Sequence, residues 1–250
     1  MGFIVLCFDD GYAETYTVAY PILKSRGFTG VVAVITSYVG GVWRDWEVGK
    51  EPHDYKLASL SQLKEMRADR WEIAPHSTTH SPHEWILNYQ GSPENFEMIL
   101  KESQDWIRRN NLGEARTFIY PFGATPQSAV EIAKKYYWLS RSLETNSPVY
   151  YDLPMNEDQR HRLWAYQVEH SRFEGQLKEI REWVRYAKKN ESIITFTFHR
   201  ITEKPRDIDS TPDELEEILK IIQDENATAT TYEDTIAQVW GSRTERMHTS

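Results

Sequence analysis

Short β-prone runs alternate with amphipathic segments along the whole chain, and this alternation limits the fold to a βα class. The predicted strands are residues 3–8, 30–35, 71–74, 116–120, 138–142, 162–168, 192–198 and 227–232. Helices are predicted between them, and several have clear start signals of a Ser or Thr followed by Pro or by a capping Gln or Glu: Ser59, Ser92, Thr125 and Thr211. The pattern indicates strands that are joined by helical crossovers.

These units follow one another without a repeat, a linker or a low-complexity segment. About seven or eight βα units without an internal boundary favour one closed or nearly closed barrel over an open doubly wound sheet. We therefore expect an α/β fold, a single-domain distorted (β/α) barrel with seven strands. The barrel is expected to occupy residues 1–240, with residues 241–250 as a C-terminal tail.

The composition excludes several classes of protein. The chain has 250 residues and a formal net charge of -9, and it lacks clusters of Lys and Arg, so no nucleic-acid partner is expected. Its single cysteine, Cys7, excludes an intramolecular disulfide and a Cys-rich zinc module. No apolar run is long enough for a transmembrane segment. The compartment stays open: extracellular or cell envelope if an export signal has been removed before Gly2, and cytoplasmic otherwise.

Polar residues come directly after several of the predicted strands. Asp9 and Asp10 follow the first strand, a histidine pair follows residues 71–74, the stretch 120–123 follows another strand, and His199 ends the run SIITFTFH. The carboxyl ends of the parallel strands in a barrel share one rim, where the active site is built. These residues are therefore expected to converge. Two carboxylates at the end of a buried strand also need a partner, and a metal ion is one.

The histidine pair has a spacing that suits metal binding. His76 and His80 are four residues apart, so on one helical turn both imidazoles would project from the same face. Together with one carboxylate they form a two-His, one-carboxylate set that leaves positions open on zinc or a similar ion. Asp9 and Asp10 are expected to divide two tasks, one as ligand and one as base. The alternative interpretation of the histidine pair is two solvated loop residues. For the two aspartates and Gly11 the alternative is an ordinary turn.

Four motifs together resemble the polysaccharide deacetylases, carbohydrate esterase family four. They are FDDGY at residues 8–12, HSTTH at 76–80, YPFG at 120–123 and FTFH at 196–199. The order and approximate spacing also match, and the resemblance spans nearly the whole chain. The pairing of FDDGY with YPFG is closest in style to deacetylases that act on poly-N-acetylglucosamine.

The resemblance implies a role for each matching residue. Asp9 would be the general base, His199 the general acid and the Phe122 backbone N–H an oxyanion donor. One divalent metal ion, Zn²⁺ or else Co²⁺, Ni²⁺ or Mn²⁺, would be held by Asp10, His76 and His80. Tyr120, Pro121 and Gly123 of the same motif would shape the loop and contact substrate. Apart from the resemblance, Arg162 and Trp85 are further candidates for substrate contact.

The chain departs from the family pattern at the arginine that often precedes the PFG-type motif. Ile119 stands at that position, so another residue must orient Asp9, and Arg162 is the candidate. The segment SRSLETN at 140–146 is a divergent counterpart of a later family motif. Loop aromatics, among them Trp43, Tyr55 and Trp85, either line a sugar cleft or cover the edges of the barrel.

The resemblance implies a metal-dependent hydrolase that removes N-acetyl groups from an N-acetylglucosamine-containing polysaccharide or oligosaccharide and releases acetate. Its partner is then an acetylated glycan. Two alternatives remain, because fold alone does not fix function. One is a hydrolase of the same fold that acts on an O-acetyl ester or a small cyclic amide. The other is a non-catalytic glycan-binding relative.

Overall fold

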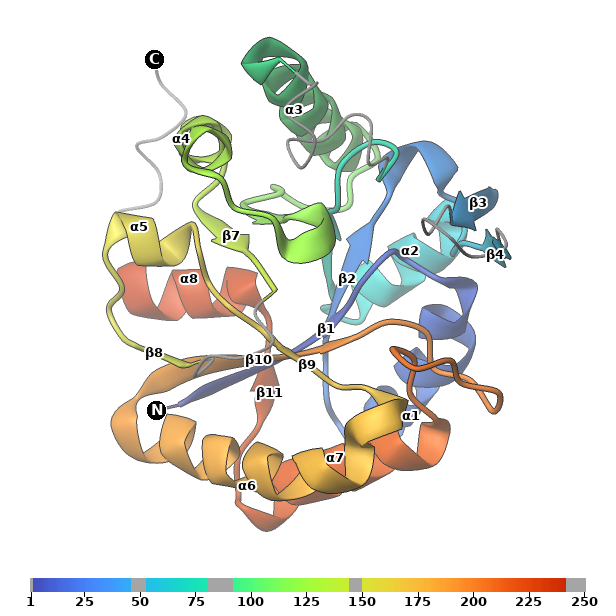
Figure 1. The fold of residues 1–250 in the computed structure, drawn as a ribbon, viewed down its shortest axis with the longest axis vertical. Helices are drawn as coiled ribbons and strands as arrows, with labels where there is room; N and C mark the ends of the chain where they lie inside the picture. The colour runs from blue at the N-terminus through green and yellow to red at the C-terminus, as the bar shows by residue number, and fades with distance from the viewer. Residues whose placement is uncertain (1, 46–52, 81–91, 144–149, 242–250) are drawn as a thin grey trace.

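The computed structural model describes residues 2–45, 53–80, 92–143 and 150–241. Within these residues, seven parallel strands form the wall of a distorted barrel surrounded by helices (Figure 1), which confirms the predicted fold class. They are β1 (Phe3–Phe8), β2 (Val31–Val34), β5 (Glu72–Pro75), β6 (Thr117–Ile119), β7 (Leu139–Arg141), β9 (Tyr166–Gln167) and β10 (Ser192–Phe198).

The barrel wall is continuous from β5 to β9 through backbone pairing. Its order is β5, β2, β1, β10 and β9, and every one of these pairs is parallel. A parallel bridge between Leu163 and Arg141 then connects the segment before β9 to β7, and β7 pairs with β6. The ring closes where β6 lies beside β5. At this junction the His76 ring is hydrogen-bonded to the Ile119 carbonyl, 2.8 Å away.

The remaining strands lie outside this ring. β3 (Val42–Asp45) and β4 (His53–Lys56) form an antiparallel hairpin. β8 (Tyr150–Asp152) runs antiparallel to β10, and β11 (Ala229–Thr230) pairs with the first half of β1. The predicted strand 162–168 is mostly irregular, since only Tyr166–Gln167 forms a strand and Leu163 makes the single bridge.

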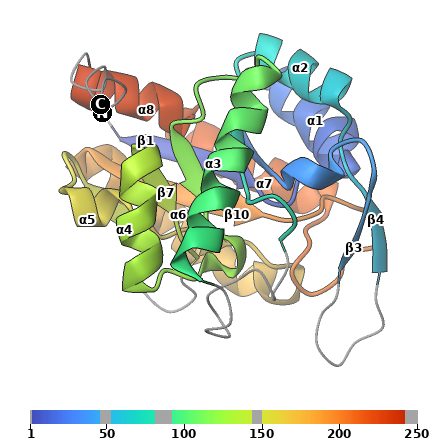
Figure 2. The same cartoon turned by 90° about the horizontal axis from the view of Figure 1, so that it is seen from above.

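Helices cover the outside of the barrel, as Figure 2 shows from above. They are α1 (Tyr20–Ser25), which continues a π-helical turn at Thr15–Ala19, α2 (Leu60–Ala68), α3 (Pro93–Arg109), α4 (Gln127–Tyr136), α5 (Glu157–Arg160), α6 (Phe173–Asn190), α7 (Pro212–Asp224) and α8 (Tyr232–Trp240). The predicted caps at Ser59, Ser92 and Thr211 are confirmed, because each side chain accepts a bond from a backbone N–H of its own helix. None of the described helices is long and apolar enough to cross a membrane.

Alternate residues of β1 separate the two layers of the core. Ile4, Leu6 and Phe8 point outward and belong to the cluster that packs β1 against the surrounding helices. Val5 and Cys7 belong instead to the cluster inside the barrel, together with residues of β2, β5, β6, β7 and β10. Tyr232 and Ile236 of α8 pack into the same interior cluster. Strand β1 is therefore buried on both faces, and its carboxyl end delivers Asp9 and Asp10 to the rim of the barrel.

Candidate active site

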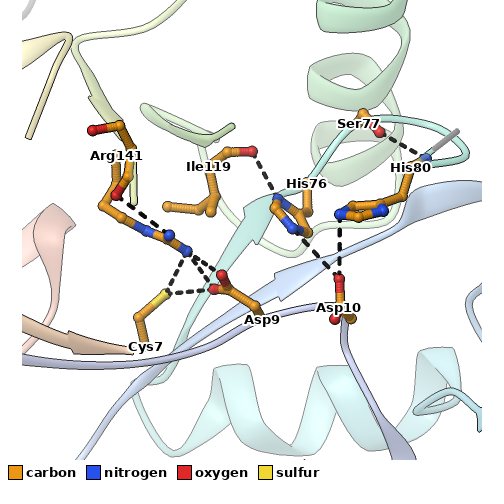
Figure 3. A network of polar contacts seen from close by, with 9 residues as sticks. Cys7, Asp9, Asp10, His76, Ser77, His80, Ile119 and Arg141 are labelled. Carbon is orange, nitrogen blue, oxygen red and sulfur yellow. Dashed lines mark hydrogen bonds and ion pairs between the residues drawn. The ribbon is translucent and has the colours of Figure 1, made fainter. Parts of the chain in front are cut away.

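The turn after β1 sends two adjacent carboxylates in different directions. Asp10 has a φ of 69° and Gly11 a φ of 75°, both in the left-handed region. A Cβ on Gly11 would also lie 3.2 Å from Val34. As Figure 3 shows, Asp9 turns toward Arg141 and Asp10 toward the two histidines. The two aspartates therefore point in different directions and have different partners.

Asp10, His76 and His80 come together as one cluster. The Nε2 atoms of His76 and His80 lie 3.5 and 3.6 Å from Asp10 Oδ1. One ligand atom from each of the three residues lies within 4.8 Å of the others, and all three residues are buried or nearly so. The Nδ1 of His76 is engaged with the Ile119 carbonyl, so its Nε2 is the nitrogen that faces the cluster. This is an arrangement that could hold a metal ion.

The HSTTH segment reaches this geometry without a helix. The prediction of a single helical turn is wrong, because Ser77 and His80 have φ values of 65° and 53°. The His80 N–H donates a hydrogen bond to Ser77 Oγ at 3.0 Å, which fixes the loop. The two imidazoles converge through this folded loop, with ring centroids 4.8 Å apart.

Burial and charge set the protonation of this cluster. Burial is the largest influence on Asp10 and would raise its pKa, but the hydrogen bond with His76 and the charges of the neighbouring histidines outweigh it, so the pKa is lowered. Burial also lowers the pKa of His80 to about 4, although Asp10 opposes that shift. At neutral pH an ionised carboxylate therefore faces a neutral His80 imidazole, and these are the forms that coordinate divalent ions.

Asp9 has a different partner, Arg141 at the end of β7. The Nη2 of Arg141 lies 2.5 Å from Asp9 Oδ2 and also contacts Oδ1, and the two side chains are only 1% and 5% exposed. Burial would lower the pKa of Arg141, but Asp9 outweighs it and raises that pKa. The guanidinium therefore stays charged and compensates the buried carboxylate.

This pairing corrects the prediction that Arg162 orients Asp9. Arg162 instead donates 2.6 Å hydrogen bonds to the Thr125 carbonyl and to Gln127 Oε1, away from Asp9. A sequence signal for Arg141 does exist. Leu139 belongs to the barrel interior, and Arg141 is two residues later on the same strand and so shares its face. An arginine on an interior face needs a buried anion, and Asp9 is that anion.

Cys7 completes the surroundings of Asp9 from inside the barrel. Its Sγ lies 3.5 Å from Asp9 Oδ1 and 3.9 Å from Arg141 Nη2. Burial and the nearby Asp9 charge raise the pKa of the thiol well above its ordinary value. Cys7 therefore stays protonated and donates a weak hydrogen bond to Asp9.

The YPFG stretch forms a tight turn beside the histidines. Phe122 has a φ of 57°, and its ring centroid lies 4.3 Å from that of His80. Gly123 has a φ of 66°, and a Cβ there would meet Leu143 at 2.5 Å, so glycine is required. The Tyr120 N–H donates to the Arg141 carbonyl at 3.0 Å, which connects this turn to the strand that supplies the arginine.

One cavity of about 510 Å³ unites these residues. The Asp9 N–H donates to the Phe198 carbonyl at 2.8 Å, which brings His199 to the same rim. The lining includes most of the predicted site: Asp9, Asp10, His76, His80, Tyr120, Phe122, Gly123 and His199. It also includes residues that the sequence did not indicate as site residues: Tyr12, Arg141, Leu143, His53, Arg206, Asp207 and Ile208. Among the predicted substrate contacts, Arg162 and Pro121 are not part of the lining that the described residues form, and Trp85 lies outside the described residues.

A sequence profile of the polysaccharide deacetylase family matches residues 2–137, more than half of the chain. This chain belongs to the polysaccharide deacetylase family. The matched segment contains the two aspartates, both cluster histidines and the PFG turn, and it confirms the resemblance that the motifs indicate. Membership in this family supports a hydrolytic activity. The two aspartates and both cluster histidines of the matched segment line the cavity described above.

The names of individual relatives are consistent with this family. YxkH of Bacillus subtilis (strain 168), whose name also refers to polysaccharide deacetylase, is 26% identical over 135 residues, which are 53% of this chain and 41% of YxkH. This chain thus spans less than half the length of that curated relative. The family 4 carbohydrate esterase from Streptomyces lividans superposes with a TM-score of 0.56 at 15% identity, covering 91% of both chains.

A second solved structure shows the same fold. It is the Xyl-CE4 domain of a multidomain xylanase from the hindgut metagenome of Trinervitermes trinervoides. Its TM-score is 0.61 at 17% identity, with 95% of this chain and 90% of that domain covered. Both likenesses extend well past residue 137, so the barrel of this chain continues beyond the segment that the family profile matches.

Proposed function

We propose that this polysaccharide deacetylase is a metal-dependent hydrolase that removes N-acetyl groups from an N-acetylglucosamine-containing glycan. One observation carries the proposal. Two adjacent carboxylates have separate partners, Asp10 with two histidines and Asp9 with a buried arginine. A metal site alone needs only Asp10 and the histidines, whereas a hydrolase also needs an ionised base that does not coordinate the metal.

The donor set fits zinc. Two imidazoles and one carboxylate leave coordination positions open, as catalytic zinc sites do. The Nδ1 bond of His76 to the Ile119 carbonyl supplies the support from a backbone carbonyl that ligating histidines usually have. A bound zinc ion would polarise the acetyl carbonyl and lower the pKa of its water toward neutrality. Co²⁺, Ni²⁺ and Mn²⁺ suit the same ligands.

The protein residues then move two protons. Asp9, which is paired with Arg141, takes a proton from the attacking water as the water oxygen bonds to the acetyl carbon. The Phe122 backbone N–H donates to the carbonyl oxygen as that oxygen gains negative charge. His199 donates a proton to the nitrogen as the carbon–nitrogen bond breaks. The immediate products are acetic acid, which ionises to acetate, and a free amine on the sugar. The proton on Asp9 then passes to solvent and His199 takes one up, which restores both residues.

The choice of glycan rests on motif style and on the cavity. FDDGY with YPFG is closest to deacetylases of poly-N-acetylglucosamine. The cavity combines ionisable groups on its floor with apolar side chains at its mouth, which suits a sugar that has both hydroxyls and apolar C–H faces.

Acetate release from defined substrates tests this proposal. The purified protein is assayed on N-acetylglucosamine oligomers, poly-N-acetylglucosamine and acetylxylan oligomers, with and without a chelator. We expect acetate from the N-acetylated chains, loss of activity after chelation and recovery when zinc is added back. Acetate from acetylxylan alone would favour the ester-hydrolase alternative. Glycan binding without acetate would favour the non-catalytic one.

A further inference from the structure

Two exposed apolar side chains stand at the mouth of the cavity. The large hydrophobic residues exposed in the described parts of the chain are Val42, Met98, Phe122 and Ile208. Of these, Phe122 and Ile208, 47% and 41% exposed, line the cavity that contains the metal-binding cluster. Apolar groups left in water next to a catalytic centre are typical of a ligand-binding surface.

The two side chains belong to opposite sides of the barrel. Phe122 follows β6, whereas Ile208 lies on the connection between β10 and α7. In the ring of strands, β7 and β9 separate β6 from β10 in one direction, and β1, β2 and β5 separate them in the other. Loops that follow opposite strands face each other across the rim. Phe122 and Ile208 therefore flank the cluster from two sides.

The loop that presents Ile208 is held in place by its own polar contacts. Asp209 is buried, and its Oδ2 accepts bonds from the Arg200 guanidinium at 3.0 Å and from the Arg206 N–H at 2.9 Å. The Ser210 N–H donates to the Arg200 carbonyl at 3.0 Å, which closes the base of the loop. The exposure of Ile208 is thus set by a fixed loop.

Polar groups line the cavity next to Ile208. Arg206 and Asp207 also line the cavity, and the Arg206 guanidinium donates to the Tyr55 hydroxyl of β4. A surface with one apolar side chain next to a cation and an anion matches a sugar ring, which has an apolar C–H face edged by hydroxyl groups.

We infer that Ile208 binds the apolar face of the sugar residue next to the one that is deacetylated. This inference depends on the proposed function, since it places the glycan substrate in the same cavity. It assigns Ile208 to substrate binding, with no part in the chemical step.

Kinetics on a long and a short substrate test the inference. For Ile208→Ala we expect KM for an N-acetylglucosamine pentamer to rise about 5-fold relative to KM for a small aryl acetate, because part of a buried apolar contact is lost. The kcat for the pentamer should stay within about 2-fold of the wild-type value. Ile208→Leu should restore KM. The matched control is Met98→Ala, which removes a 52% exposed apolar side chain from α3 and should change neither KM.

Each outcome has a distinct meaning. An unchanged pentamer KM in Ile208→Ala, or an equal rise for the aryl acetate, would overturn the inference. If the wild-type protein releases no acetate from either substrate, the proposed function fails. In that case the binding of the pentamer, measured by calorimetry, tests the Ile208 contact without catalysis. Binding to Ile208→Ala that is about 5-fold weaker than to the wild type would support the contact, and equal binding or no binding would contradict it.

Discussion

The two ends of the barrel both contain buried carboxyl groups, but they neutralise them in different ways. At the carboxyl end of β1, Asp9 faces the Arg141 guanidinium and Asp10 faces two imidazoles. At the amino end, Glu72 is the first residue of β5 and is 1% exposed. Its Oε2 accepts a 2.9 Å bond from the backbone N–H of Glu233, in the first turn of α8.

The pKa shifts follow from these partners. The pKa of Glu72 is raised to about 8, first by burial and then by the charge of Glu233. The pKa of Asp10 is lowered, although burial acts on it in the same direction as on Glu72. The difference is that imidazole nitrogens face Asp10 directly, whereas Arg67 at the amino end pairs with Glu233 and has the smallest of the effects on the pKa of Glu72. A carboxyl group that only ties α8 to the barrel can be neutral, whereas one that ligates a metal or accepts a proton must be ionised.

Removal of Arg141 should give the largest effect. Arg141→Met leaves Asp9 buried without its counter-charge, so we expect unfolding in urea to require about 3–5 kcal/mol less free energy. We also expect kcat for deacetylation to fall by roughly 100-fold or more, because Asp9 loses the partner that orients its carboxylate.

The exposed pair Arg44 and Asp54 provides the control. Its nitrogen–oxygen distance is 2.7 Å and both side chains are 52% exposed. Arg44→Met should cost at most about 1 kcal/mol. If the two substitutions lower the free energy of unfolding by the same amount, burial does not strengthen the pair of Asp9 and Arg141.

The Glu72→Gln variant should give a smaller effect that depends on pH. The pKa of Glu72 is about 8 in the folded protein and near 4.5 in an unfolded chain. Between these values the folded state binds more protons, so this residue makes the protein less stable as pH rises from about 5 to 8. Glu72→Gln removes that loss. The free energy of unfolding of the variant minus that of the wild type should therefore be roughly 1–3 kcal/mol larger at pH 8 than at pH 5.

Urea denaturation at several pH values measures this difference. The exposed residue Glu174 gives the control, since Glu174→Gln should show no such trend. A stability difference between Glu72→Gln and wild type that stays constant with pH would show that Glu72 is ionised in the folded state. The amino end would then resemble the carboxyl end.

Substitution of Cys7 should have the smallest effect. Cys7→Ala removes a weak donor to Asp9 but leaves Arg141 in place, so kcat should fall only about 2- to 5-fold. Cys7→Ser retains a donor and should recover most of the loss. A fall of 100-fold in Cys7→Ala would mean that the thiol, more than the arginine, positions Asp9.

The sequence predicts the barrel and most of the cavity floor because these depend on local rules. Alternating patterns and capping residues locate the strands and helices, and the residues after parallel strands converge by topology. The SRSLETN segment contains Arg141, but its pairing with Asp9 does not follow from the motifs, since the two residues are 132 positions apart and meet through the barrel interior. The HSTTH geometry was missed because left-handed Ser77 and His80 are set by the surrounding contacts, which spacing does not reveal.

The division of labour between the two aspartates is tested most directly by zinc binding. Zinc affinity of the wild-type protein, Asp9→Asn and Asp10→Asn is measured by titration calorimetry after chelator treatment. The account predicts that Asp9→Asn binds one zinc ion with nearly wild-type affinity, while Asp10→Asn loses affinity by 100-fold or more, on the order expected for loss of a ligand. Equal loss of zinc in both variants, or retention in both, would contradict the assignment of Asp10 as the ligand and Asp9 as the base.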